Sequence, residues 1–213
     1  MTQNTNNPTL PLRIGITGGI GSGKSYICHQ LEAAGHPVFY CDDVAKHIIR
    51  THPEVKQALQ QLVGTEVYDA EGKLMKSVLA AYLCQGTIYS KQVDQIVHPK
   101  VAEAFQQFAL EHAQSEITPP HPLTLADHKE ISIKTLTALP PRSTVFMECA
   151  LLFESGFDKL VDRSILVHVS HETQITRLMQ RDHINREKAL HWMALQLSEE
   201  EKLQRANAFL INE

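Results

Sequence analysis

The sequence contains few cysteines, no long apolar segment and no marked excess of charge of one sign. Its cysteines, Cys28, Cys41, Cys84 and Cys149, are scattered through 213 residues without a CxxC pair. This argues against a disulfide framework or a zinc knuckle and favours a reducing cytoplasm. No apolar run approaches the roughly 18 residues that span a bilayer. The net charge of −4 gives no general attraction to nucleic acid or membrane, so neither is expected as a partner.

The overall composition is that of a globular protein. Hydrophobic residues make up 43% and charged residues 21% of the chain, enough for one sizeable core with a small additional subdomain. The segment 1–11 is polar and uncharged, unlike a secretory signal, and is predicted to be a disordered leader. We expect a monomer or a weak homo-oligomer.

Strand and helix patterns alternate at the start of the chain. Residues 12–17 form a short apolar run ended by glycines, 22–31 show a helical pattern, and 37–40 predict a second strand. A strand, a helix and a strand within about 30 residues form a βαβ unit, which is typical of a parallel sheet. Apolar residues at helical spacing then predict an almost wholly helical segment at 42–113.

Strand patterns return after a proline-rich segment. Residues 114–143 contain five prolines and many polar residues. They predict a loop that is long for a connection inside a compact domain. Further strands and helices are predicted at 144–149, 164–169, 171–182, 185–195, 198–206 and 208–211. The pattern as a whole predicts an α/β fold with a helical block inserted between early and late strands.

Residues 18–25 match the phosphate-binding pattern GxxxxGK[ST], with a predicted strand before them and a predicted helix after them. Glycines here let backbone N–H groups point at phosphate oxygens, and the helix N-terminus adds partial positive charge. Lys24 can reach the β- and γ-phosphates, and Ser25 offers a hydroxyl to Mg²⁺. The residues expected to bind ATP are Gly19, Ile20, Gly21, Ser22, Gly23, Lys24 and Ser25.

Two classes of P-loop protein fit the sequence poorly, and a third fits better. A GTPase would show DxxG after a strand and an NKxD motif, and the apolar run before Glu148 is short for a mechanical ATPase. Small-molecule kinases place an acidic residue after the second strand, where it orients the acceptor hydroxyl and accepts its proton. Asp42 and Asp43 fall at this position. For either residue, position alone does not decide between catalysis and helix capping.

Arg177 and Arg181 lie four residues apart on a predicted helix and therefore share one face. Two guanidinium groups on one face suit a polyanion, because each can bridge phosphate oxygens. For an isolated pair, a solvated helix face with Asp182 beside Arg181 is the simpler interpretation. After a P-loop, a lid that closes over the phosphates is favoured.

Taken together, these segments resemble the dephospho-CoA kinase family. The resemblance is carried by the P-loop GITGGIGSGKS, the acidic segment after the second strand, His98-Pro99, "LLFESGFDKLVD" at 151–162 and the segment 174–212. Members of this family transfer the γ-phosphoryl group of ATP to the ribose 3′-hydroxyl of dephospho-CoA. The resemblance implies a P-loop NTPase fold with a parallel sheet core, an inserted helical substrate-binding domain and a helical lid.

The resemblance also implies a domain organisation and a set of site residues. The implied core is 12–64 and 144–213 with its lid at about 171–196, the insertion is 65–113, and 114–143 is a Pro-rich loop. Asp42 matches the family's catalytic base, and Asp43 falls on a variable position. Residues implied on the substrate side are Lys76, His98, Leu152 and Glu154, and Asn212 is implied near the adenine. ATP, Mg²⁺ and dephospho-CoA are the implied cofactors and substrate.

The sequence departs from the family pattern at a few positions. Tyr40 stands where the family has a first acidic residue, Lys76 where it has Arg, Ala150 where it has Pro, and Asn207 where it has Asp. Lys does not reproduce the bidentate contacts of Arg. Two alternatives therefore remain open: a P-loop kinase for another small acceptor, such as a nucleoside or nucleotide, or a non-catalytic nucleotide-binding regulator.

Overall fold

The computed structural model describes residues 10–113 and 129–213. The strands are β1 (Leu12–Thr17), β2 (Val38–Tyr40), β3 (Lys129–Glu130), β4 (Thr144–Glu148), β5 (Arg163–His168) and β6 (Ala208–Ile211). The helices are α1 (Lys24–Ala33), α2 (Cys41–Thr51), α3 (Pro53–Val63), α4 (Lys76–Leu83), α5 (Thr87–Glu111), α6 (Ile133–Thr137), α7 (His171–Asp182), α8 (Arg186–Met193) and α9 (Glu199–Arg205). Short 3₁₀ turns lie at Thr65–Val67, Pro141–Ser143 and Phe157–Leu160.

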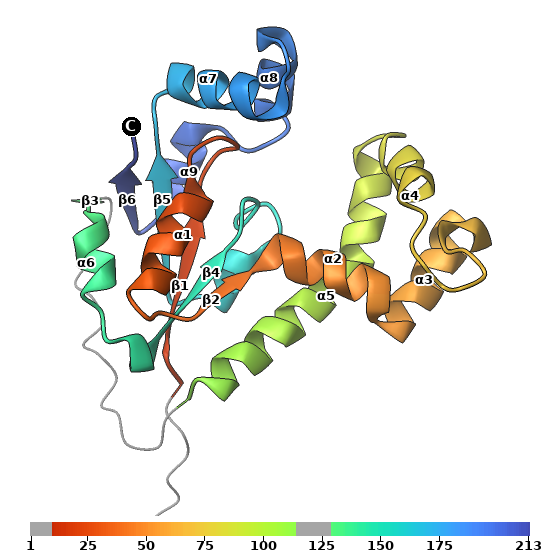
Figure 1. Cartoon of the computed structure of the whole chain (residues 1–213), viewed down its shortest axis with the longest axis horizontal. Helices are drawn as coiled ribbons and strands as arrows, with labels where there is room; N and C mark the ends of the chain where they lie inside the picture. The colour runs from red at the N-terminus through yellow and green to blue at the C-terminus, as the bar shows by residue number, and fades with distance from the viewer. Residues whose placement is uncertain (1–9, 114–128) are drawn as a thin grey trace, which may run out of the picture. The chain divides into compact units, whose positions relative to one another are not determined.

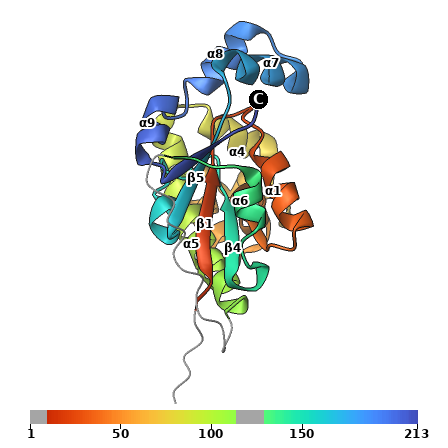
Figure 2. The same ribbon diagram turned by 90° about the vertical axis from the view of Figure 1, so that its left-hand side faces the viewer.

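The strands form one sheet in the order β2-β4-β1-β5-β6-β3. β1 pairs in parallel with β4 and β5, and β6 pairs in parallel with β5 and β3. Figures 1 and 2 show α1 and α6 on one face of the sheet and α9 on the other. Strands covered on both faces read as continuous apolar runs, and Ile16, Phe146 and Leu166 are accordingly 0% exposed. The predicted α/β fold with a parallel sheet is confirmed.

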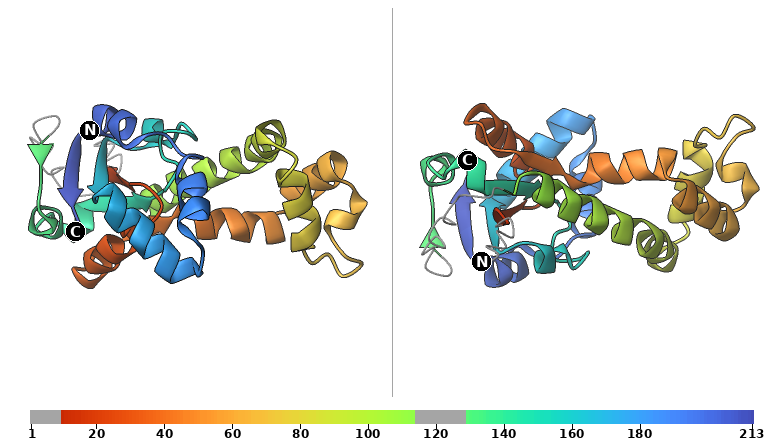
Figure 3. Two further views of the ribbon diagram at one scale, coloured as in Figure 1. Left: turned by 90° about the horizontal axis from the view of Figure 1, so that it is seen from above. Right: turned by 90° about the horizontal axis from the view of Figure 1, so that it is seen from below.

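The described chain divides into two compact units. One contains the residues up to Phe39 and from Gln107 onward, and the other is Tyr40–Gln106. The second unit holds α2, α3, α4 and the first part of α5, which gather together in Figure 3. Its buried apolar residues include Ile48, Val55, Leu59, Val67, Val93, Val97 and Val101. The helical character predicted for 42–113 is confirmed, while the substrate-binding role of 65–113 stays a prediction.

Two local predictions differ from the structure. The N-cap of α2 is Tyr40, and Asp42 and Asp43 lie inside the first turn, so capping by either carboxylate is wrong. Acidic residues in a first turn still interact favourably with the helix dipole. The segment 114–143, predicted as a loop, contains β3 and α6 in its described part. The rest of that segment and most of the predicted leader, 114–128 and 1–9, lie outside the described residues.

The described helices and cysteines bear on two further expectations. Within 10–113 and 129–213, no helix is both long enough and apolar enough to cross a membrane. All four cysteines carry free thiols, and Cys84 alone among them is exposed. Burial in α1 raises the pKa of the Cys28 thiol, and the nearby carboxylate of Glu148 adds to the shift. Cys28 is therefore a neutral core residue.

Candidate active site

The loop between β1 and α1 turns sharply at Gly21 and Gly23. The N–H of Ser22 donates to the carbonyl of Gly19 at 3.0 Å, closing a β-turn in which Gly21 has a φ of 84°. Gly23, the N-cap of α1, has a φ of 86°. A Cβ on Gly23 would also collide with the side-chain amide nitrogen of Asn212. Glycine is thus required at Gly23 by backbone conformation and by close packing.

Lys24 extends its ammonium group back over this loop. Its Nζ donates to the carbonyl oxygen of Gly18 at 2.9 Å and to that of Gly19 at 3.3 Å, and the residue is only 8% exposed. The helix that follows begins without a side-chain cap within the described structure, so its first-turn N–H groups are left for another partner. Several N–H groups and one ammonium group at the same loop make an anion-binding cradle.

Ser25 lies in the first turn of α1 with its side chain exposed. A hydroxyl oxygen is the type of ligand that Mg²⁺ accepts beside nucleotide phosphates, so the residue fits the predicted role. Among the described residues, no group of three or more His, Cys, Asp or Glu side chains is placed to hold a metal ion. The role of Ser25 as a ligand of Mg²⁺ stays a prediction.

Asn212 and Arg177 both reach the carbonyl oxygen of Ser22. The Nδ2 of Asn212, just after β6, donates to it at 2.9 Å, and the Nη1 of Arg177, on α7, donates at 3.5 Å. The three residues are far apart in the chain, and the sheet brings them together. The predicted lid arginine Arg177 therefore lies at the phosphate cradle, and so does Asn212, which the resemblance places near adenine.

Arg181 is engaged elsewhere. Its Nε and Nη2 bind the carboxylate of Asp182 at 3.1 and 2.7 Å, and its side chain is 60% exposed. The hydrogen bonds from Arg181 lower the pKa of Asp182. The local pairing with Asp182 that the sequence suggests is thus present, and the role of Arg181 at the phosphates stays a prediction.

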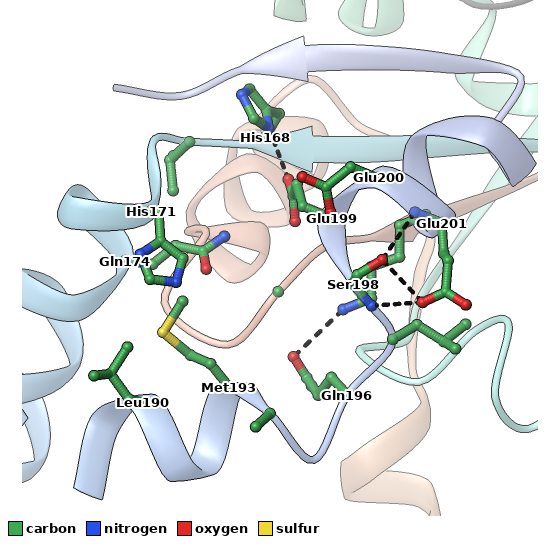
Figure 4. Close-up of a pocket in the computed structure, with 15 residues that line it drawn as sticks. His168, His171, Gln174, Leu190, Met193, Gln196, Ser198, Glu199, Glu200 and Glu201 are labelled. Carbon is green, nitrogen blue, oxygen red and sulfur yellow. Dashed lines mark hydrogen bonds and ion pairs between the residues drawn. The ribbon is translucent and has the colours of Figure 1, made fainter. Parts of the chain in front are cut away.

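Gln196 is a contact that the sequence does not reveal. It lies between α8 and α9, and its Oε1 accepts a hydrogen bond from the backbone N–H of Ile20 at 2.9 Å. It also lines a pocket of about 790 Å³ beside Gly19, whose wall includes His168, Gln174 and residues of α9 (Figure 4). No motif marks a glutamine 176 residues away from its partner as a P-loop contact.

The two substrate-side residues of the first unit differ in exposure. Leu152 is 0% exposed, and a Cβ on Gly15 would lie 2.9 Å from its Cδ2, so the side chain belongs to the core. Glu154 is exposed, and its Oε1 accepts the N–H of Leu197 at 2.9 Å. Glu154 therefore fixes the connection between α8 and α9.

The remaining predicted residues belong to the second unit. Asp42 lies exposed in the first turn of α2, and the neighbouring Asp43 binds Nζ of Lys46 at 3.0 Å. Lys76 is exposed at the start of α4. His98, on α5, has its Nε2 3.5 Å from Oδ1 of Asp94.

Comparison with known sequences identifies a family. The family model described as dephospho-CoA kinase matches residues 12–131 and 121–213. The dephospho-CoA kinase of Bacteroides fragilis is 36% identical over 204 residues, covering 96% of this chain and 86% of that protein. The dephospho-CoA kinase of Halalkalibacterium halodurans is 30% identical over 201 residues, covering 94% and 88% respectively.

Comparison with solved structures gives the same fold. The protein TT1252 of Thermus thermophilus is 27% identical with a TM-score of 0.69, over 96% of this chain and 90% of that one. The dephospho-CoA kinase of Campylobacter jejuni has a TM-score of 0.60 at 22% identity, over 94% and 87%. At 22% identity, the similarity to the Campylobacter jejuni structure supports the fold alone. The predicted P-loop kinase fold is confirmed.

Proposed function

The chain belongs to the dephospho-CoA kinase family, and we propose that it transfers the γ-phosphoryl group of ATP to the ribose 3′-hydroxyl of dephospho-CoA, giving coenzyme A. The observation that carries the proposal is a fully formed P-loop between β1 and α1 on a chain that matches the family along its described length. A non-catalytic nucleotide-binding regulator needs the phosphate cradle but no base for an acceptor. The kinase and the regulator therefore differ in whether they need the carboxylate of Asp42.

Binding of ATP is assigned to the P-loop. Backbone N–H groups of Gly21 and Gly23 and the ammonium of Lys24 hold the β- and γ-phosphates, as expected for a loop of this shape. Ser25 contributes its hydroxyl to Mg²⁺, which neutralises phosphate charge when bound. Asn212 and Arg177 hold the Ser22 carbonyl and so help to keep the loop open for phosphate.

The acceptor hydroxyl is assigned to Asp42. The carboxyl ends of parallel strands share one edge of a sheet, and Asp42 follows β2 as the P-loop follows β1. Asp42 hydrogen-bonds the 3′-hydroxyl and takes its proton as the phosphoryl group moves. Because Tyr40 replaces the acid usual in the family, this role falls on Asp42 alone.

The other predicted residues complete the proposed site. Arg177 and Arg181 close over the phosphates from α7 as charge develops there. Lys76 and His98 contact dephospho-CoA. Glu154 and Leu152 act on the substrate side through the segment they stabilise, and Asn212 also borders the adenine. We propose the cytoplasm as the compartment, in keeping with four free thiols, and a monomer or weak homo-oligomer.

A panel of acceptors tests the proposal. Purified protein with Mg-ATP is assayed for ADP release and for phosphorylated product with dephospho-CoA, nucleosides, nucleotides and shikimate-like alcohols. We expect turnover with dephospho-CoA at a rate at least tenfold above any other acceptor. Folded protein that binds ATP but does not phosphorylate dephospho-CoA would overturn the proposal.

A further inference from the structure

Gln196 connects the P-loop to a buried lysine. Its Oε1 accepts the N–H of Ile20 at 2.9 Å and lies 3.5 Å from the Nζ of Lys202 on α9. Figure 4 shows the carboxamide of Gln196 at the edge of the pocket, with the second of these contacts drawn as a dashed line. One oxygen therefore joins the phosphate cradle to the helix that follows the lid.

Lys202 has an environment that is rare for lysine. It is 1% exposed, and burial lowers the pKa of its ammonium, while the charges of Glu154 and Glu199 oppose that shift. The Oε1 of Glu199 is in turn hydrogen-bonded to Nδ1 of His168, at the end of β5, at a distance of 2.7 Å. A buried charge is retained only with compensating partners. Gln196 is the partner whose oxygen Nζ contacts directly.

The N–H of Ile20 belongs to the turn that shapes the P-loop. Ile20 is the second residue of the turn closed by Ser22 and Gly19, and the hydrogen bond to Gln196 is partly buried. A donor left without a partner in such a position carries a desolvation penalty, which the loop would relieve by changing conformation. The acceptor on Gln196 therefore favours one shape of the turn, and the ammonium of Lys202 fixes where that acceptor lies.

We propose that Gln196 is a positioning residue for the P-loop and that Lys202 acts through it to hold the loop in its phosphate-binding shape. The phosphate cradle is thereby tied to the connection between the lid helices and α9. The inference rests on the proposed function only where turnover with dephospho-CoA is measured. The affinity for ATP can be measured without any acceptor.

Two substitutions at Gln196 separate positioning from packing. Gln196→Met keeps a similar length and removes the acceptor, whereas Gln196→Glu keeps an acceptor that can also pair with Lys202. We expect Gln196→Met to weaken Mg-ATP binding by about 3- to 10-fold and to raise KM for ATP in parallel. Gln196→Glu should stay within about threefold of the unaltered protein. Gln204→Met, at an exposed site on α9, is the matched control and should change neither quantity.

A second substitution tests the route through Lys202. Lys202→Met should weaken ATP binding by a similar factor, and adding it to Gln196→Met should cause little further loss, because residues that act as a unit are not additive. ATP affinity is measured by calorimetry and KM and kcat by ADP release, with thermal unfolding to confirm folding. Equal effects of Met and Glu at Gln196, or full additivity with Lys202→Met, would contradict the proposal. If Lys202→Met does not fold, the comparison of Gln196→Met with Gln196→Glu tests the proposal. If the unaltered protein does not turn over dephospho-CoA, the proposed function is contradicted. The ATP affinities of the variants can still be compared, so the inference about Gln196 is still tested.

Discussion

Two adjacent carboxylates at the start of α2 differ in their surroundings. Asp43 pairs with Lys46 at 3.0 Å, and both side chains are exposed, so the pair contributes little to stability. Asp42 is exposed, and within the described residues no hydrogen bond or ion pair of its carboxylate is present. Asp42 is therefore the carboxylate that an acceptor hydroxyl can reach without displacing a partner.

The first prediction concerns Asp42. Asp42→Asn keeps the shape and removes the base, so kcat with dephospho-CoA should fall by roughly 10²–10⁴-fold. The affinity for Mg-ATP should change little, because the phosphates bind at the P-loop. Steady-state ADP release and calorimetric ATP binding measure the two quantities.

The matched control is Asp43→Asn, one residue along the same turn. It should leave kcat within about twofold, because it breaks only an exposed pair with Lys46. A fall of kcat with Asp43→Asn as large as that with Asp42→Asn would show that neither carboxylate is specifically the base. Unchanged kcat with Asp42→Asn would favour an activity that needs no base at this position.

At the level of single residues, the sequence predicts the phosphate cradle but not the tertiary contacts that hold it in place. The spacing of Gly18, Gly23 and Lys24 is local, so a pattern reveals it. The contacts of Ser22 with Asn212 and of Ile20 with Gln196 join segments 190 and 176 residues apart. Such pairs are made by the tertiary fold, and a single sequence carries no signal for them.

Among the helices, α9 is short and depends on its first turn. The Oγ of Ser198 accepts the N–H of Glu201 at 3.2 Å, and the N–H of Ser198 donates to the Glu201 carboxylate at 3.0 Å, which forms a capping box. The Ser198 hydroxyl also donates to the Glu201 carboxylate at 2.9 Å, and this hydrogen bond, together with that from the Ser198 N–H, lowers the pKa of Glu201. Because α9 has only seven residues, the cap satisfies a large share of its terminal N–H groups.

The second prediction follows from this cap. Ser198→Ala should lower the free energy of unfolding by about 1 kcal/mol, measured by urea denaturation. Glu200→Ala is the control, since Glu200 is exposed in the same turn and takes no part in the capping box. Equal losses for the two variants would show that the capping box does not stabilise the native state. Because α9 carries Lys202, Ser198→Ala should also weaken ATP binding more than Glu200→Ala does.

Elements with a clear apolar pattern are predictable from the sequence, including the short strand β6, whereas an element without such a pattern is not. β1, β5 and α7 have apolar patterns long enough to identify them, and the predicted ranges for β1 and α7 agree with the structure. β3 has two exposed charged residues, Lys129 and Glu130, so no alternation can mark it. It is a strand only because β6 offers an edge to pair with. The start of α2 was misjudged because Asp is a common N-cap, whereas here the chain enters the helix at Tyr40 directly from β2.

For the molecule as a whole, stability should depend on pH in two separate windows. Burial opposes ionisation of Asp162, but its hydrogen bonds with Arg13 outweigh burial and lower its pKa below the usual value. The stability from that carboxylate is present above about pH 4 and is lost as the pH falls through the lowered pKa. Any loss of stability between pH 5 and 7 must therefore come from another group.

His36 is the group expected to act in that higher window. It lies between α1 and β2, is 3% exposed, and packs against the ring of Phe146 at 5.1 Å with an interplanar angle of 86°. Burial lowers the pKa of His36. Below about pH 6.5 the unfolded chain binds a proton there that the folded chain does not. Stability therefore falls as the pH drops from 6.5 toward the lowered pKa, by at most about 1.4 kcal/mol per pH unit.

The third prediction is that removing this group flattens the pH dependence. Urea unfolding of the unaltered protein and of His36→Leu is compared at pH 7.5, 6.5 and 5.5, and the variant should lose less stability on acidification. His191→Gln, at an exposed position on α8, is the control and should follow the unaltered protein. The comparison uses the slope against pH, so a lower absolute stability of His36→Leu does not affect it. Equal slopes for all three proteins would show that His36 is protonated alike in the folded and unfolded chains, and an NMR titration of its ring would then give an ordinary pKa.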